Sequence, residues 1–103
     1  MAISDVQEIH SNEYRVLDQK GSFLSQRSIR YDEKLVGVGA DFYVTTMQGE
    51  IYTFDENSHR ITNFSLGGFE VKNVVGNTIN LVRGTALRTY DKNLNFINER
   101  TIY

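Results

Sequence analysis

Apolar and polar residues alternate along most of this chain in short runs that are typical of β-strands. In the run at residues 50–57, Ile51 and Thr53 fall on one face of an extended strand, while Tyr52 and Phe54 fall on the other. The runs are rich in Val, Ile, Thr, Tyr and Phe, and no segment keeps the period of an amphipathic helix. The pattern predicts an all-β chain. Because both faces of this strand carry apolar groups, we expect its sheet to be packed between two neighbours.

The same pattern occurs three times. Residues 50–57 match residues 86–93 in type after a shift of 36, and residues 13–20 after a shift of 37 in the other direction. An aspartate opens the same turn in each copy, and its carboxylate can accept a hydrogen bond from the backbone two residues later. These aspartates are Asp18, Asp55 and Asp91. Each copy is predicted to be a β-hairpin with a turn of about four or five residues.

The segments that precede the second and third hairpins also resemble each other. Each contains two further strand-like runs, and Gly49 or Gly84 marks the turn into the hairpin. The sequence therefore predicts a single repeat domain over residues 1–103, built from four-stranded antiparallel repeats. Two repeats are complete and one is truncated: residues 33–66, residues 69–102, and the truncated copy at residues 4–29.

Residues 42–55, FYVTTMQGEIYTFD, read as a β-run, a polar turn with glycine, and an apolar-Tyr-x-apolar-Asp strand. This arrangement resembles a β-propeller blade and is similar to quinoprotein-type blades, without the Trp that is common in them. No quinone or other cofactor is implied. A propeller closes with about four to eight blades, so we expect a homo-oligomer, with a dimer favoured, to complete the ring and cover apolar faces at the ends of the array. The alternative is a single closed β-barrel or β-sandwich.

The composition narrows the classes of partner. The net charge is −2, and the eleven Lys and Arg residues never form a run, which argues against a broad nucleic-acid surface. There is no apolar run of about 18 residues and no signal-like start, so we expect a cytoplasmic protein that does not bind membranes. The chain has no Cys, and neither His10 nor His59 has a partner at metal-ligand spacing, so no metal or cofactor is expected.

The sequence contains no convincing catalytic motif. Gly37-Val38-Gly39 begins like a dinucleotide-binding loop, but no third glycine and no helix follow. Asp91-Lys92-Asn93 begins like a calcium loop, but Phe96 occupies the position that such loops reserve for glycine. We interpret both segments as structural.

The loops between repeats offer a binding surface, because in a propeller they gather at one rim. Arg, Tyr, Phe and Met are enriched at binding hot spots. The candidate binding residues are Arg30, Tyr31, Met47, Gln48, Phe69 and Arg83. The leading prediction is a non-catalytic binding or protein-interaction module for a protein, peptide or saccharide, the last implying a lectin-like protein. The alternative is a small hydrolase or lyase with a site in an oligomeric channel.

Overall fold

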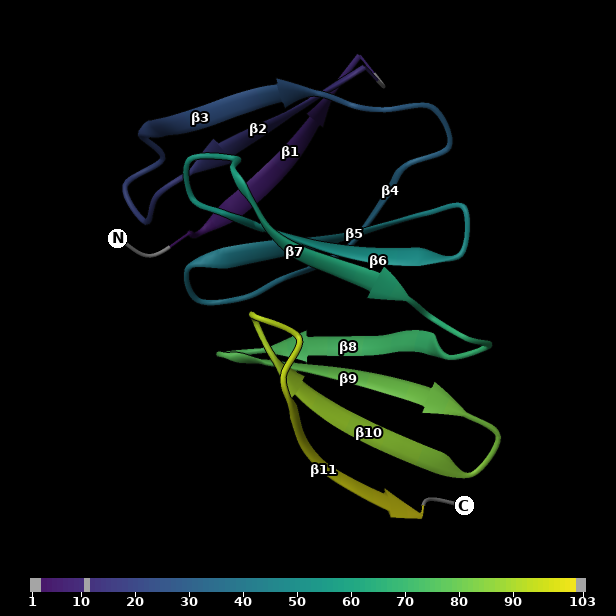
Figure 1. Cartoon of the computed structure of the whole chain (residues 1–103). Helices are drawn as coiled ribbons and strands as arrows, with labels where there is room; N and C mark the ends of the chain where they lie inside the picture. Colours follow the sequence, from purple (N-terminus) through teal and green to yellow (C-terminus); the bar gives the residue numbers. More distant parts are fainter. Residues whose placement is uncertain (1–2, 11, 102–103) are drawn as a thin grey trace.

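The computed structural model describes residues 3–10 and 12–101, and within them it contains eleven strands and no helix (Figure 1). The predicted all-β class is confirmed. The N-terminal sheet contains β1 (Asp5–Ile9), β2 (Glu13–Leu17) and β3 (Phe23–Ser28). The middle sheet contains β4 (Lys34–Val38), β5 (Phe42–Met47), β6 (Glu50–Asp55) and β7 (Arg60–Ser65). The C-terminal sheet contains β8 (Glu70–Val75), β9 (Thr78–Arg83), β10 (Ala86–Asp91) and β11 (Phe96–Thr101).

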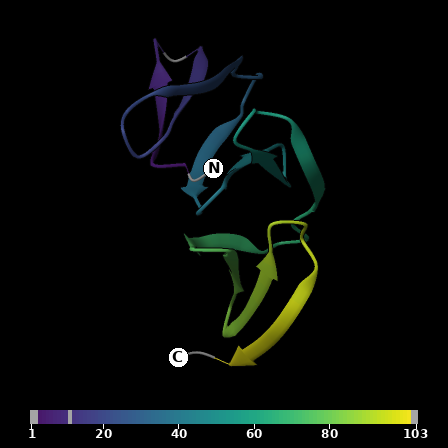
Figure 2. The same cartoon turned by 90° about the vertical axis from the view of Figure 1, so that its left-hand side faces the viewer.

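Each sheet is an antiparallel meander in which every strand pairs with its neighbours along the chain. Figure 2 shows the three sheets following one another along the long axis of the molecule. In the described part of one chain the sheets form neither a closed barrel nor a closed propeller ring. No helix in these residues is long and apolar enough to cross a membrane. Residue 102, where the last repeat was predicted to end, lies outside the described residues.

The aspartate-led turns form as the sequence predicts. In each turn one carboxylate oxygen, Oδ1, accepts the backbone N–H groups of the residues two and four positions later, at 2.9–3.0 Å. The residue three positions after the aspartate has a positive φ in every copy. These residues are Gly21 (φ 77°), Ser58 (φ 62°) and Leu94 (φ 60°). The carboxylate thus fixes one turn geometry for three different residues.

The apolar core lies in two seams between consecutive sheets. In the first seam, Tyr52 and Phe54 of β6 pack with Tyr14 and Val16 of the N-terminal sheet. In the second seam, Ile51 of the same strand packs in a cluster with residues of the C-terminal sheet, among them Ile79, Leu81 and Tyr90. The prediction that both faces of this strand are covered is therefore confirmed.

The two outer faces of the stack mix polar side chains with apolar ones, among them Phe23 (56% exposed) and Val75 (59% exposed). Val6 faces the first seam, so Asp5 and Gln7 point away from it, and both are exposed. On the C-terminal sheet, Asn80 Nδ2 donates to Asn73 and Thr89 Oγ1 donates to Asn80 Oδ1, each at 2.7 Å. These hydrogen bonds satisfy the polar groups on this face. At the positions equivalent to Thr78 and Asn80 of the C-terminal sheet, the middle sheet has the apolar residues Phe42 and Val44.

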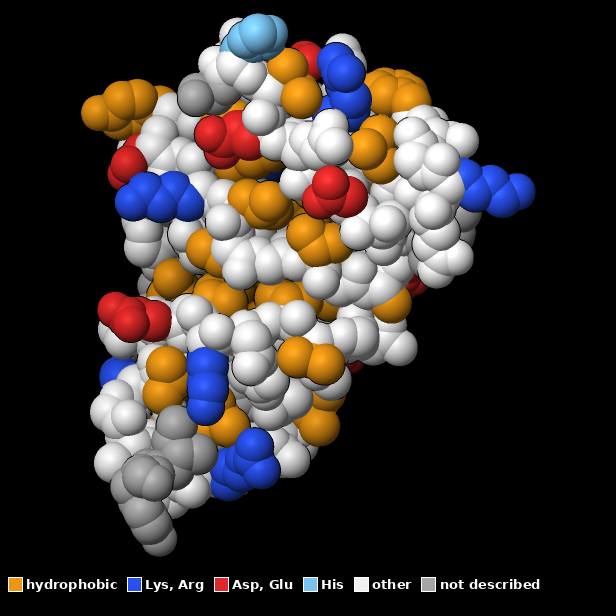
Figure 3. Space-filling model, turned by 180° about the vertical axis from the view of Figure 1, so that it is seen from behind, with side chains coloured by type: hydrophobic (Ala, Val, Ile, Leu, Met, Phe, Trp, Pro, Cys, Tyr) orange, Lys and Arg blue, Asp and Glu red, His pale blue; other side chains and the backbone are white. Residues whose placement is uncertain are grey.

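Glycines allow the sheets to approach each other closely along the edge formed by β4 and β8. A Cβ atom on Gly37 would come within 2.2 Å of Val74 Cγ2, and one on Gly39 would come within 2.8 Å of the Gly76 carbonyl oxygen. Backbone hydrogen bonds join all three sheets here, from Ile3 N–H to Ala40 and from Ala40 N–H to Gly76. Figure 3 views this side and shows hydrophobic side chains across its middle. The Gly37-Val38-Gly39 segment thus serves packing.

Candidate ligand-binding site

All six predicted binding residues lie at one end of the stack, which we call the rim. It consists of the loops before β4 (residues 30–33) and β8 (residues 66–69) and the turns β5–β6 (residues 47–50) and β9–β10 (residues 83–86), all on the right in Figure 1. The aspartate-led turns lie at the opposite end. Leu66 N–H donates to Gly49 O, and Arg83 Nη1 donates to Gly67 O, so hydrogen bonds tie the rim segments together.

Met47 and Gln48 line a small depression of about 170 Å³ at the β5–β6 turn, together with Asp32, Lys34 and Leu66. Tyr31 is 87% exposed and does not belong to the lining of this depression. These residues therefore lie near one another on the rim without enclosing a ligand.

Phe69 and Arg83 line a second cavity, of about 270 Å³, between the middle and C-terminal sheets. We call it the basic groove. Its lining includes Phe64, Leu66, Phe69, Arg83, Arg88 and Tyr90. Phe69 is 7% exposed and belongs to the core of the second seam, so it forms a fixed apolar base for the groove.

Two guanidinium groups lie against the Phe69 ring. The Cζ atoms of Arg83 and Arg88 are 4.6 Å and 4.7 Å from the ring centre, within cation–π range. Arg88 Nε donates to Glu99 on the outer strand β11, and this hydrogen bond raises the pKa of Arg88. Arg83 makes a hydrogen bond to the Gly67 carbonyl. Two positive charges are thus held beside one carboxylate.

The Arg30 side chain extends from the rim into the first seam, where it belongs to a group that we call the Glu33 cluster. The cluster consists of Arg27, Arg30, Glu33, Tyr43 and Thr45. Arg27 binds the Glu33 carboxylate through both Nη atoms, at 2.9 Å and 2.5 Å. The Arg30 backbone N–H donates to it at 3.0 Å, its guanidinium lies 3.5 Å away, and Thr45 Oγ1 donates at 2.7 Å.

The Glu33 carboxylate stays ionised in spite of its burial. Its side chain has no exposed surface, and burial alone would raise its pKa. The hydrogen bonds from Arg27, the Arg30 N–H and Thr45 outweigh this effect and lower the pKa of Glu33 to about 2. Burial, together with the negative charge of Glu33, raises the pKa of Tyr14 to about 12. The first seam therefore carries a negative charge that the protein itself neutralises.

The sequence interpretation missed Arg27 and Arg88, because Arg27 contacts Tyr43 and Phe54 across the first seam and Arg88 contacts Phe69 two strands away in its own sheet. A signal existed for Arg27. Arg27 pairs across strands with Tyr14, and Phe64 pairs with Ile51, which is the residue equivalent to Tyr14 in the middle repeat. An arginine therefore stands in the first repeat where the middle repeat has an aromatic residue. Arg88 faces the second seam where Tyr52 faces the first, and the pairing of β10 with β9 and of β9 with β8 brings it to Phe69, which directly precedes β8.

The groove offers hydrogen-bond donors and an apolar base, which suit binding. The part of the chain that the structure describes contains no group of three or more His, Asp or Glu side chains placed to hold a metal ion. No protein-family model matches this chain, and no curated protein matches it.

Proposed function

We propose that this protein is a non-catalytic binding module whose ligand site is the basic groove. The observation that carries the proposal is the pair of arginines held against a buried phenylalanine at the edge of a cavity. Ligand sites typically combine an apolar lining with a few fixed polar groups. Phe69 and Leu66 supply the apolar lining, while Arg83 and Arg88 supply the donors.

A fragment screen followed by amide chemical shifts in two-dimensional NMR spectra tests this proposal. We expect the hits to shift the amide signals of residues 66–69 and 83–88, and to leave those of the aspartate-led turns unchanged. Hits that cluster elsewhere, or a screen without hits, would argue against the groove as a ligand site. A measured turnover that is lost on changing Arg83 would argue against a non-catalytic role.

We further propose that the three sheets are successive propeller-type blades and that a second copy of the chain extends the array to six. Their meander order, their stacking through shared seams and the close approach of β4 to β8 support this interpretation. Because the outer faces mix polar and apolar side chains, matched polar groups would set the register in which two copies associate.

The existing seams indicate which groups would meet between copies. Arg27 lies over the Phe54 ring at 3.8 Å and donates to the Tyr43 hydroxyl at 2.9 Å; Phe64 contacts the Tyr90 ring in the second seam in the same way, at 5.3 Å between centres. On the outer face of the C-terminal sheet, Arg100 occupies the position equivalent to Arg27 and Phe64. By strand register, Asp5 on the N-terminal sheet is equivalent to Tyr43. Continuing the array would therefore bring Arg100 of one copy beside Asp5 of the next.

A charge swap tests this arrangement. We expect light scattering at low ionic strength to give twice the mass of one chain, and we expect Arg100→Asp or Asp5→Arg alone to give monomers. The double variant, which restores opposite charges, should recover the dimer. A monomeric wild-type protein at all concentrations, or a double variant no better than the single variants, would contradict the proposed contact.

A further inference from the structure

We infer that the basic groove takes a ligand that carries a carboxylate on a small apolar group. The inference rests on the proposed function of the groove and specifies its ligand. It comes from comparing the groove with the Glu33 cluster, because the two sites occupy equivalent places in successive seams.

Glu33 and Phe69 are equivalent residues of the two complete repeats. Each lies in the loop before the first strand of its sheet, and each closes the same turn. Glu33 N–H donates to Arg30 O at 3.1 Å, and Phe69 N–H donates to Leu66 O at 3.0 Å. The two side chains therefore enter their seams from the same place in the repeat.

Both seams also hold two arginines against one aromatic ring. In the first seam, the Cζ atoms of Arg27 and Arg30 lie 3.8 Å and 5.9 Å from the centre of the Phe54 ring, and Arg30 lies closer to Tyr52, at 4.4 Å. In the second, Arg83 and Arg88 lie at 4.6 Å and 4.7 Å from the centre of the Phe69 ring. An aromatic ring flanked by two guanidinium groups is thus common to both sites.

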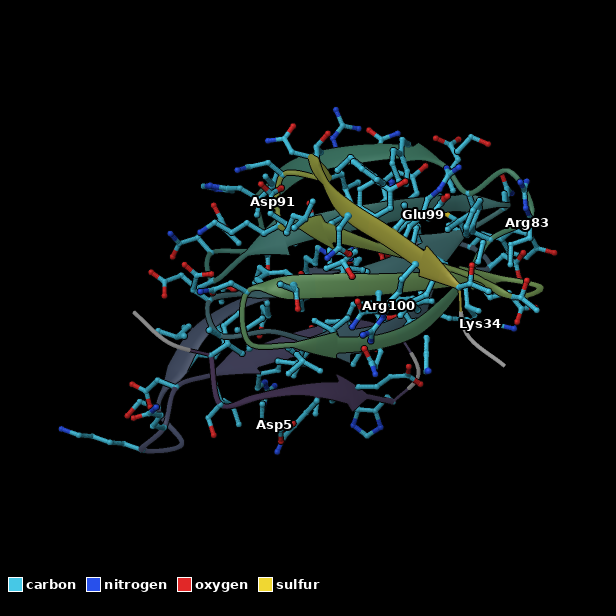
Figure 4. The ribbon with its side chains drawn as sticks, turned by 90° about the horizontal axis from the view of Figure 1, so that it is seen from below. Asp5, Lys34, Arg83, Asp91, Glu99 and Arg100 are labelled. Carbon is cyan, nitrogen blue, oxygen red and sulfur yellow. The ribbon has the colours of Figure 1, made fainter. Side chains whose placement is uncertain are left out.

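The sites differ in what neutralises the arginines. Glu33 accepts hydrogen bonds from both Arg27 and Arg30, so the chain supplies its own carboxylate. In the second seam the equivalent residue is Phe69, which has no charge. Among the described residues only Glu99 forms an ion pair with either groove arginine, and it reaches Arg88 alone. Figure 4 shows Glu99 on β11 and Arg83 at the rim end of the same sheet.

The Glu33 carboxylate bound by arginines in the first seam therefore shows how we expect a ligand carboxylate to bind in the second seam. A planar carboxylate can accept two parallel hydrogen bonds from a guanidinium group, as Glu33 does from Arg27. Among the described residues Arg83 makes one hydrogen bond, from Nη1 to Gly67 O, and its other guanidinium N–H groups could bind a ligand carboxylate. Leu66 and Phe64 would contact the apolar part of the ligand. A depression of about 580 Å³ beside Arg27 and Arg30 offers no equal site, because Glu33 already binds both.

Titration with phenylacetate and its neutral analogue phenylacetamide tests this inference. We expect phenylacetate to bind at least about tenfold more tightly, with amide shifts at Phe69 and Arg83, and its affinity to fall as salt is added. Arg83→Gln and Arg88→Gln should each weaken phenylacetate binding several-fold and leave phenylacetamide binding nearly unchanged. Arg60→Gln is the matched control, since Arg60 is an exposed arginine at the opposite end of the stack and should have no effect.

The outcomes separate this inference from the proposed function. If both compounds shift the groove signals equally, the groove binds ligands but does not select carboxylates, and the inference fails alone. If neither compound nor any screened fragment reaches the groove, the proposed function fails as well. Inorganic phosphate that binds as tightly as phenylacetate would overturn the assignment of a carboxylate.

Two peptides distinguish a free small acid from an acidic side chain as the source of the carboxylate. Both are acetylated and amidated tetrapeptides, and they differ only in having Glu or Gln at the second position. Tighter groove binding of the Glu peptide would identify an acidic peptide as a ligand, whereas phenylacetate binding without peptide binding would restrict the site to small acids.

Discussion

Replacement of Glu33 by Gln tests whether the buried ion pair holds the N-terminal and middle sheets together. The change keeps the shape of the side chain and removes the charge that Arg27 and Thr45 bind. The fall in the pKa of Glu33 from 4.5 to about 2 corresponds to about 3 kcal/mol of stability at neutral pH. Breaking a buried ion pair typically costs about 3–5 kcal/mol, which agrees with this value.

The assay is urea unfolding followed by circular dichroism and tyrosine fluorescence at pH 7. We expect Glu33→Gln to lower the free energy of unfolding by about 3 kcal/mol, a large share of what a domain of this size has. Replacing both Arg27 and Glu33 by Phe, which copies Phe64 and Phe69 of the second seam, should recover part of this loss, because it removes both buried charges while Arg30 and Thr45 still lose their acceptor.

The pH dependence provides a second test. The pKa of Glu33 is lower in the folded state than in the unfolded chain, so its stabilisation is complete above about pH 4.5 and is lost as the pH falls through about 2. The difference in stability between wild type and Glu33→Gln should therefore shrink across that window. A cost below about 1 kcal/mol at pH 7, or a difference that does not change with pH, would refute the reasoning.

Three further tests concern two other parts of the fold and the Glu33 cluster, each measured as a free energy of unfolding. Gly37→Ala should cost about 1–3 kcal/mol because its Cβ would overlap Val74, and Val74→Ala should relieve part of the overlap, since Val74 Cβ at 2.7 Å remains; additive effects would contradict the contact. Asp55→Ala removes the acceptor of two backbone N–H groups and should cost about 1–2 kcal/mol, whereas the nearby Asn57→Ala should change little. Added acetate should partly restore the stability of Glu33→Ala, and chloride at the same ionic strength should not.

Local patterns in the sequence were sufficient to predict the strands and the aspartate-led turns. The alternation around Tyr52 and Phe54 depends only on neighbouring residues, and Asp55 binds the backbone of its own turn. The polar residues on the outer faces were not anticipated, because the expectation extended the apolar pattern of the middle sheet to the outer ones. The sequence does carry that information, since Thr78 and Asn80 stand where the middle repeat has Phe42 and Val44.

The candidate site was less accessible to sequence reasoning. Phe69 and Arg83 were named from loop composition, and both line the groove. Arg30 was named on the same ground, yet it binds Glu33 in the other seam. Composition cannot distinguish these arginines, because the difference between them depends on which carboxylates the stacked sheets bring within reach.

The glycine at position 37 has a geometric consequence for how the sheets are oriented. At this edge the seam is so narrow that Val74 leaves no room for a Cβ atom, whereas away from it aromatic rings such as Phe64 and Tyr90 occupy the space. Two sheets that nearly touch along one edge and are separated by aromatic rings elsewhere must splay apart, so that the planes of consecutive sheets are inclined to each other. The size of side chains across the seam therefore sets the angle at which each layer tilts from the last.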